Sequence, residues 1–400
     1  MLRYLTLIDN IILYSIYGYF FLIFLSKGEG VRNILIFGSF FLWLMTKGYR
    51  KKAPLKDPVS ISFFLFLSVI ALSALFSLNP GYSIWQLQGD PLKGLVLFFV
   101  ISTALSSEER LKHLPVIGLA ASLLIVTTGY YSYLFHDLPL LKPDTSIMHA
   151  WHNKFARYLN TYHPFIFCLF FIWKRKSLKA LVAGSLVYTV IALLLSTSRG
   201  GFLAFSTMLI IWLIYLTRKE GYNLRRLVLS FLIFFLIVGT VSWFSSPYLR
   251  LRFKNTLPDI RTLNNRLPTW KTAIKAVKER PILGWGHGGR YFKDAKIYES
   301  AGLTVPRTGP ENTFLKVLFH YGVGGLLIYI LFLLISIYRF TRGAFGREGI
   351  SSYILVACLS VLIGNYIVNA MLAVLRLKYL AVIVAIGVAA IHSENEDSHS

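Results

Sequence analysis

The sequence predicts an all-α polytopic membrane protein of about 12 transmembrane helices, with one large periplasmic loop between spans nine and ten. Three observations predict this class. Hydrophobic residues make up 55% of the 400 residues and charged residues only 15%, whereas a soluble domain carries about 25% charged residues. The mean hydropathy is +0.59. Apolar stretches long enough to cross a bilayer, which takes about 20 residues, recur along the chain. These numbers exclude soluble, fibrous, disordered and disulfide-scaffold classes.

Twelve apolar segments are expected to be spans, and the second and fourth are short enough to be re-entrant. Their centres are Ile11–Leu25, Ile34–Met45, Val59–Leu78, Leu95–Leu105, Leu114–Phe135, Tyr158–Trp173, Ala180–Leu195, Phe202–Leu216, Leu227–Phe244, Tyr321–Ile337, Ile354–Ala370 and Tyr379–Ile391. Strands are not expected, because these segments are continuously apolar whereas barrel strands alternate. The first span lacks a signal-peptide cleavage site and should stay as an anchor. Cys168 and Cys358 lie in apolar runs, so no disulfide or thiolate metal site is expected.

The loop charges indicate the orientation of the spans. Basic clusters follow spans two, six, eight and ten, around Lys51, Arg175, Lys219 and Arg342. They share one side, which the positive-inside rule places in the cytoplasm together with both termini. The same rule explains much of the net charge of +24. No basic tail or aromatic-rich RNA motif accompanies this charge, so no nucleic-acid partner is expected.

The large loop divides the chain into residues 1–244 with spans one to nine, the loop 245–311, and residues 312–400 with the last three spans and a cytoplasmic tail. The loop holds 13 Lys and Arg against 5 Asp and Glu. It follows span nine, and long loops cross the membrane regardless of charge, so it is expected on the outer side of the membrane. It is either a soluble cap or a surface that attracts phosphate-bearing lipids or sugars.

Within the loop, residues 270–280 have the pattern of a short amphipathic helix. Trp270, Ala273, Ile274 and Val277 recur at helical spacing, and lysines are expected on another face. Prolines at positions 268 and 281 suit the first turn and the end of such a helix. A basic amphipathic helix beside a membrane tends to lie at the interface, in contact with membrane lipids.

Three polar motifs on the predicted outer side are candidates for chemistry. The first is the arginine hairpin (Ser196–Gly201), where Arg199 is either an interfacial snorkelling residue or a site residue facing the bundle. Its glycines favour the second alternative, because they permit a tight turn and a close backbone approach. The second motif places Arg266 just before the amphipathic helix. The third begins with Glu311 and Asn312 at the mouth of span ten, where Glu311 is either a helix cap or a general base.

A glycine turn (Gly284–Arg290) follows the amphipathic helix and contains His287 and Arg290. The order of Ser-Arg-Gly, Arg before Trp, Pro-x-x-Gly-Trp-Gly, and Asn nine residues before Gly-x-x-Gly resembles the O-antigen ligase and polymerase superfamily. The resemblance covers 196–325 through its motifs and the remainder through topology. The length and the twelve-span layout are similar to the ligase branch.

The resemblance implies a metal-independent, inverting glycosyltransferase of lipopolysaccharide biosynthesis in the bacterial inner membrane, without a cofactor. Such an enzyme moves polysaccharide from undecaprenyl pyrophosphate to lipid A–core oligosaccharide on the periplasmic side. Arg199 and Arg266 match the arginines that hold the donor pyrophosphate, as guanidinium groups can do through paired hydrogen bonds. The sequence contains no Asp-x-Asp motif, which fits arginine in place of a divalent metal.

One residue departs from the ligase pattern: Glu311 stands where ligases have histidine. A glutamate can still accept the proton of an acceptor hydroxyl, so Glu311, Arg199 and Arg266 are the expected catalytic residues. His287, Arg290 and Asn312 are expected to bind substrate, and His287 is also an alternative base. His320 lies deeper and is expected to be a packed polar residue.

Three rivals to the ligase interpretation follow from the same sequence. An O-antigen polymerase, which extends lipid-linked glycan, shares the motifs and tolerates variation at Glu311. A flippase or other transporter would have charges through the middle of several spans and an internal repeat, and the sequence has neither. A non-catalytic scaffold would leave Arg199 and Arg266 dispensable.

Overall fold

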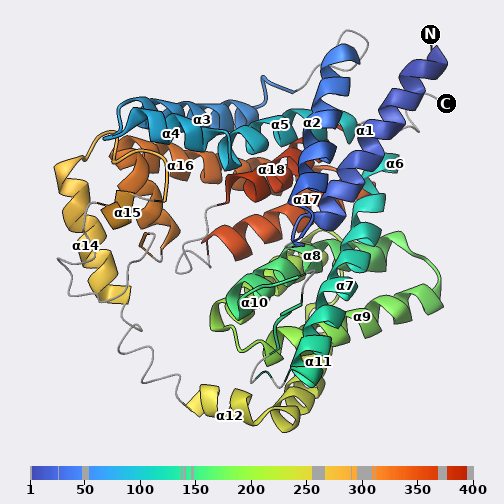
Figure 1. Ribbon diagram of the computed structural model, residues 1–400. Helices are drawn as coiled ribbons and strands as arrows, with labels where there is room; N and C mark the ends of the chain where they lie inside the picture. The colour runs from blue at the N-terminus through green and yellow to red at the C-terminus, as the bar shows by residue number, and fades with distance from the viewer. Residues whose placement is uncertain are drawn as a thin grey trace.

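The computed structural model describes residues 2–25, 27–46, 54–136, 138, 141–145, 148–254, 266–289, 291–294, 309–310, 312–367 and 376–393. These residues are nearly all helical, and among them there is no strand beyond an isolated bridge between Asp144 and His149. In chain order the helices (Figure 1) are α1 (Leu2–Leu22), α2 (Glu29–Thr46), α3 (Pro58–Leu75), α4 (Pro80–Leu87), α5 (Asp90–Ala104), α6 (Glu108–Leu111), α7 (His113–Phe135), α8 (His152–Ile172), α9 (Lys176–Leu195), α10 (Arg199–Arg218), α11 (Leu224–Ser245), α12 (Pro247–Lys254), α14 (Arg266–Glu279), α15 (Tyr291–Asp294), α16 (Thr313–Gly346), α17 (Gly349–Val361), the π-helix η4 (Leu362–Ile367) and α18 (Leu377–His392).

A helix lies at each of the twelve places where the sequence predicts a span. Eight helical segments of the described residues are long and apolar enough to cross a membrane. They are Tyr4–Leu22, Pro58–Leu75, Glu108–Phe135, Lys176–Leu195, Arg199–Arg218, Leu224–Ser245, Thr313–Gly346 and Gly349–Tyr366. The all-helical, multi-pass character is therefore confirmed, while the count of twelve spans and the periplasmic position of the large loop stay predictions.

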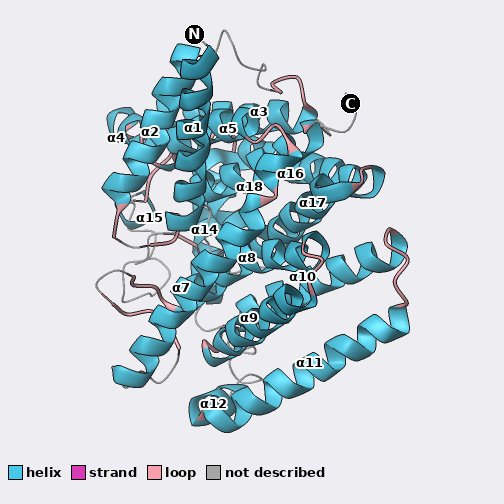
Figure 2. Ribbon diagram, turned by 90° about the vertical axis from the view of Figure 1, so that its right-hand side faces the viewer, coloured by secondary structure: helices cyan, strands magenta, loops and turns pink. Residues whose placement is uncertain are grey.

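Helix α18 lies in the middle of the bundle (Figure 2). Its residues from Leu380 to Ile391 are buried on every side, which is the pattern of a helix enclosed by other helices. It packs along α5 and α17, while the long α16 packs against α3 and α17. By contrast, α11 runs along the edge of the bundle (Figure 2) and exposes Leu236 and Phe244 to 70% and 76%. An apolar helix exposed in this way is suited to face lipid.

One end of the bundle is tied together by a buried carboxylate. Asp57 caps α3 by accepting a hydrogen bond from the Val59 N–H at 2.9 Å. It also accepts from Arg339 of α16 at 2.7 Å and lies 3.0 Å from His392 Nε2 at the end of α18. Burial alone would raise the pKa of the Asp57 carboxyl, but these hydrogen bonds outweigh it and lower the pKa below its ordinary value.

The predicted large loop contains short helices, as expected: α12, α14 and α15. Helix α14 packs against the first part of α16 and buries Ala273 and Val277. Ile274, which the pattern groups with the apolar face, is 48% exposed and lies beside the exposed Lys271 and Lys278. The reason is helical geometry: Ile274 lies three and four residues from these lysines and so shares their face.

Candidate functional site

The arginine hairpin packs tightly on α8. Arg199 is the first residue of α10, and the Ser198 hydroxyl caps this helix by accepting from the Gly201 N–H at 3.2 Å. The turn holds Thr197 in the left-handed region, with a φ of 55°. A Cβ on Gly201 would lie 2.4 Å from the Ala156 Cβ, so only glycine fits against α8 here. The expected close backbone approach is therefore confirmed at Gly201.

Side chains of α8 fix the hairpin further. Ser198 Oγ donates to Asn153 Oδ1 at 2.8 Å, and Asn160 Nδ2 donates to the Gly201 carbonyl at 2.7 Å. Asn160 is fully buried, and its amide is thereby matched by the backbone of α10. These contacts hold the start of α10, including the backbone of Arg199, in one position relative to α8.

The glycine turn and a kink in α16 form one structural unit. At Gly322 the backbone leaves the helix with a φ of 69°, which breaks the helical hydrogen bonds across this point. The Val323 N–H donates instead to the Pro281 carbonyl at 2.7 Å, and the Phe319 carbonyl accepts from the Trp285 N–H at 3.0 Å. The segment 281–286 thus supplies the backbone partners that the kink removes.

Two histidines join the same unit in different ways. His320 is buried, its Nδ1 lies 2.8 Å from the Gly286 carbonyl oxygen, and its own carbonyl accepts from the Gly286 N–H at 3.0 Å. His287 is partly exposed, and its Nδ1 forms a 2.7 Å hydrogen bond with the Tyr321 hydroxyl. Burial lowers the pKa of His287 to about 4, so its imidazole is neutral at neutral pH.

The mouth of α16 is capped by Asn312, whose Oδ1 accepts from the Leu315 N–H at 3.0 Å. Arg266 begins α14, and its side chain lies outside the described part of the chain, as do Glu311 and Arg290 as a whole. The structure therefore brings together the glycine turn with His287, the start of α16 with Asn312, and the helix that Arg266 begins. Arg199 lies on α8.

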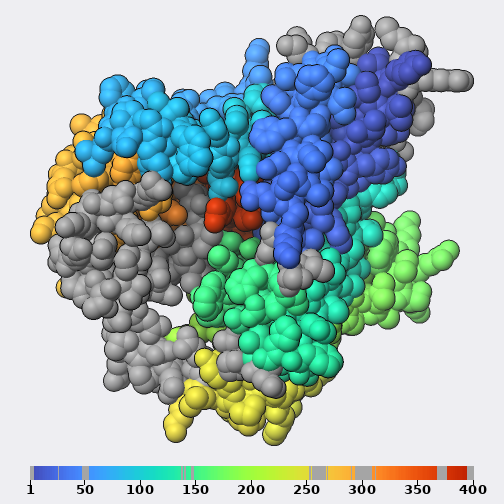
Figure 3. Space-filling model, in the orientation of Figure 1, coloured from blue at the N-terminus to red at the C-terminus, as the bar shows by residue number. Residues whose placement is uncertain are grey.

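A cationic cluster that the sequence analysis did not single out lies where α8, α16 and α18 begin. Its members are Lys154 and Arg157 of α8, Lys316 of α16, Arg376, and Lys378 of α18. Asp90, the first residue of α5, pairs with Arg376 at 3.4 Å and with Lys378 at 3.6 Å. Lys316 lies within electrostatic range of Arg376 and Asp90. Figure 3 shows red residues of α18 at the bottom of a hollow between blue and green parts of the chain.

One signal in the sequence could have revealed this cluster. Its charges stand at the edges of predicted spans, and ionisable residues at membrane depth usually mark a site. Lys316 follows Asn312 by four residues, and Arg157 immediately precedes the sixth predicted span. Taken singly, each of these charges resembles the loop charges that orient the spans.

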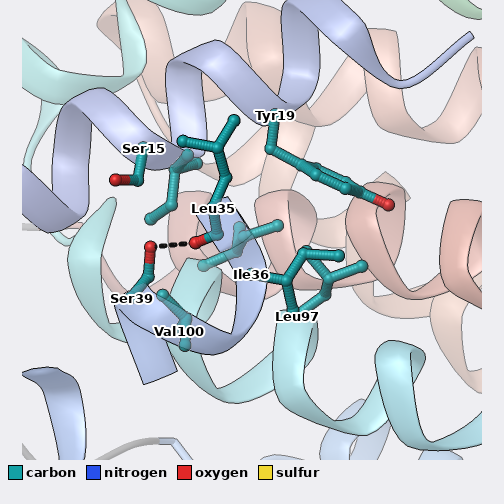
Figure 4. A pocket seen from close by; sticks show the side chains of 9 residues that line it. Ser15, Tyr19, Leu35, Ile36, Ser39, Leu97 and Val100 are labelled. Carbon is teal, nitrogen blue, oxygen red and sulfur yellow. Dashed lines mark hydrogen bonds between the residues drawn. The ribbon is translucent and has the colours of Figure 1, made fainter. Parts of the chain in front are cut away.

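A small crevice elsewhere in the bundle is not part of this site. It lies between α1, α2 and α5 (Figure 4) and is partly open to solvent. Its lining is Ser15, Ile16, Tyr19, Leu35, Ile36, Ser39, Leu97, Val100 and Ile101. Ser39 Oγ donates to the Leu35 carbonyl, so this hydroxyl is already satisfied. A crevice with this uncharged lining does not suit an anionic group.

Fold and site together define a multi-pass helical membrane protein with a concentration of positive charge where several helices begin. Residues 184–330 match the family model described as O-antigen ligase. The resemblance to the O-antigen ligase and polymerase superfamily is thereby confirmed over this part of the chain. The matched segment includes Arg199, Arg266, the glycine turn and the kink at Gly322. Lys154, Arg157, Arg376 and Lys378 lie outside it.

A protein of Haemophilus influenzae, described only as uncharacterized, is 26% identical to this chain over 218 residues. The match covers 50% of this chain and 53% of that protein, so the chain spans about half the length of the curated relative that it matches.

Proposed function

We propose that this protein is an O-antigen ligase, which transfers polysaccharide from undecaprenyl pyrophosphate to lipid A–core oligosaccharide at the periplasmic face of the bacterial inner membrane. The family match over residues 184–330 supports a glycosyltransferase-like membrane enzyme of the ligase or polymerase type. The observation that carries the proposal is the arginine hairpin seated on α8, beside the cationic cluster and within reach of several helix N-termini.

This arrangement suits a diphosphate. Helices α8, α10, α16 and α18 begin in this region, and the N-terminal end of a helix carries partial positive charge and free N–H groups. Arg199 adds a guanidinium group at the first position of α10. Guanidinium groups bind phosphate oxygens in pairs of hydrogen bonds, and they also stabilise the charge that develops on a leaving diphosphate.

The proposed reaction is a direct displacement that inverts the anomeric carbon. A hydroxyl oxygen of the acceptor sugar attacks this carbon, the bond to the diphosphate oxygen breaks, and its electron pair leaves with undecaprenyl pyrophosphate. Glu311 accepts the hydroxyl proton. Arg199 and Arg266 hold the diphosphate and supply the positive charge that a divalent metal would otherwise provide. His287, Arg290 and Asn312 orient the two substrates.

The same proposal places all twelve predicted spans across the membrane and residues 245–311 in the periplasm. Helices α8, α10, α16 and α18 are the even-numbered spans six, eight, ten and twelve, which begin on the outer side in this arrangement. The site at their N-terminal ends therefore lies on the outer side. The opposite end carries the tie between Asp57, Arg339 and His392, next to the loops with the predicted cytoplasmic charge. This distribution of charge supports the assigned orientation.

Reconstitution in vesicles tests the function. The full chain is supplied with lipid-linked glycan and, in a parallel sample, with lipid-linked glycan plus lipid A–core. Glycan attached to lipid A–core supports the ligase. Longer lipid-linked glycan supports a polymerase instead, the alternative that gains weight because Glu311 stands where ligases have histidine. Glycan that crosses the bilayer without any new glycosidic bond would replace both with a transporter. An Arg199→Ala sample serves as the inactive control.

A further inference from the structure

Arg157 is a buried arginine whose charge is not matched within the described residues. Its side chain is only 9% exposed, and its Nε has no hydrogen-bond partner there. The guanidinium carbon lies 5.6 Å from the centre of the Tyr158 ring and 5.9 Å from that of Tyr379. Aromatic faces stabilise a cation in part, but they do not replace the hydrogen bonds that a guanidinium group loses on burial.

Two charged residues of the cluster that lie near Arg157 are themselves positive. Lys154 lies one helical turn earlier on α8, and burial together with the charges of Arg376 and Arg157 lowers the pKa of its ammonium group. Arg376 stands immediately before α18. Three cations that approach one another in this way repel, so the arrangement is stable only if an anion or ordered water lies among them.

Asp90 does not fill this role for Arg157. It is the acidic residue that the described chain brings to the cluster, and its two oxygens pair with Arg376 and Lys378. No ion pair of Arg157 or Lys154 occurs among the residues that the structure describes. A ligand with several negative oxygens would therefore find unmatched donors at this place.

We propose that Lys154, Arg157 and Arg376 form a phosphate-binding subsite for a lipid-linked saccharide substrate, in addition to Arg199 and Arg266. A phosphate group fits because one tetrahedral anion can accept from two guanidinium groups and an ammonium group at once. The N-termini of α8 and α18 favour the same charge.

The subsite adjoins the arginine hairpin along α8. Ala156, the residue before Arg157, touches Gly201, and Asn153, the residue before Lys154, is bonded to Ser198. A phosphate here would therefore lie next to the group that Arg199 holds. It belongs either to the donor diphosphate or to a phosphate on the acceptor lipid. The inference relies on the proposed function only for the identity of the molecule that bears this phosphate.

The first test measures binding without any reaction. The full chain in nanodiscs is titrated with inorganic pyrophosphate, and Arg157→Gln and Arg376→Gln are each compared with the unaltered protein. We expect the dissociation constant to rise about 10- to 100-fold, the range for a lost hydrogen bond to a charged group. The Arg376 side chain is 52% exposed, so this second variant keeps the test valid if Arg157→Gln fails to fold.

Arg32→Gln is the matched control. Arg32 is as buried as Arg157, at 8% exposure, but its guanidinium group donates to the carbonyl oxygens of Leu22 and Leu25. We expect this variant to bind pyrophosphate within about twofold of the unaltered protein. Unchanged pyrophosphate binding by folded Arg157→Gln or Arg376→Gln would overturn the subsite. An equal loss of pyrophosphate affinity in Arg32→Gln would also overturn the subsite. Binding would then depend on the total positive charge of the protein and not on these particular residues.

The second test identifies the carrier by transfer kinetics. If the donor diphosphate binds here, Arg157→Gln should raise the KM for donor about tenfold or more, with acceptor KM unchanged. If an acceptor phosphate binds here, acceptor KM should rise instead, and only with phosphorylated lipid A–core. No change in either KM would contradict the subsite while leaving the proposed function intact. Conversely, lost pyrophosphate binding in a protein that transfers no glycan would retain the subsite and reject the ligase.

Discussion

Arg199 stands at a position where the helix dipole alone opposes a positive side chain. It is the first residue of α10, where the helix dipole is positive, and a positive side chain there costs about 0.3–1 kcal/mol. The hydrogen bonds of Ser198 and Gly201 to α8 keep it there nevertheless. A local cost of this kind is typical of functional sites.

Replacement of the two arginines tests their role. We expect Arg199→Ala and Arg266→Ala each to abolish glycan transfer, because the diphosphate loses its paired hydrogen bonds. Lysine at either position should restore little activity, since it keeps the charge without the planar fork. Arg218→Ala, at the far end of α10, is the control and should transfer normally. Near-normal transfer by Arg199→Lys would indicate that a point charge is sufficient.

Glu311 can be tested as a base without disturbing its helix, because Asn312 is the cap of α16. Removal of a general base typically slows a reaction 10²–10⁴-fold. We expect Glu311→Gln to slow transfer by about this factor with donor binding unchanged, and Glu311→His to keep partial activity. Asn312→Ala should instead destabilise the protein by about 1 kcal/mol through loss of the cap. Full activity of Glu311→Gln would make His287 the next candidate.

The residues of the site were predictable where a local pattern marks them. An arginine between glycines, or a run of alternating glycines, is unusual enough to be noticed in a single sequence. Arg157 and Arg376 were not predictable in this way, because each stands in a basic stretch at the edge of a span. Only the folded chain shows that they lie in one cluster, since Arg157 contacts the Tyr379 ring of α18 and both arginines lie within electrostatic range of Lys154.

At the scale of elements, the exchange of hydrogen bonds between 281–286 and α16 explains why two glycine motifs occur in one chain. The kink needs Gly322, since a Cβ there would lie 2.1 Å from the Ile282 carbonyl oxygen. The turn needs Gly284 for the same reason, because its Cβ would lie 2.5 Å from the His320 backbone. The glycine turn and the kink at Gly322 therefore depend on each other. Together they hold α14 against the mouth of α16.

Gly322→Ala should separate these two elements. The substitution combines a φ of 69° with a backbone clash, so we expect it to lower stability by at least 1–3 kcal/mol. Transfer should fall with it, because His287 and α14 lose their support. Gly239→Ala in α11 is a suitable control, since nothing lies within 4 Å of its added Cβ. Equal thermal unfolding of the two variants would show that the kink is not needed.

Helix positions were well predicted because apolar length and periodicity are local properties. The apolar pattern locates the centres of the spans and not the helix ends: the span centred on Tyr321–Ile337 belongs to α16, which runs from Thr313 to Gly346. The first part, from Thr313 to Tyr321, is a separate helical stretch before the kink at Gly322, and the helix continues past Ile337 through residues that include Arg339 and Arg342. The contact of α14 with α16 was not predictable from the pattern, since small residues such as Ala273 and Ala276 form it while Ile274 stays exposed.

At the scale of the whole molecule, Asp57 joins three helices that are distant in sequence, α3, α16 and α18. Its pKa is lower in the folded state, so its contribution to stability is present above its ordinary pKa of 3.8 and is lost as pH falls through the lower folded value. We expect the unfolding temperature of the unaltered protein to fall below about pH 4. Asp57→Asn should be less stable at pH 7 and lack this acid-dependent loss. A parallel pH profile for both proteins would contradict the assignment.

The orientation of the whole chain decides whether the site can meet periplasmic substrates, and it can be tested by labelling. Cys168 and Cys358 are both completely buried, so an impermeant maleimide should react little with the unaltered protein. Lys278 of α14 and Lys176 of α9 are exposed and accept cysteine without loss of packing. We expect Lys278→Cys to be labelled in spheroplasts and Lys176→Cys only after the membrane is permeabilised. Labelling of both from the same side would overturn the twelve-span arrangement and the periplasmic site with it.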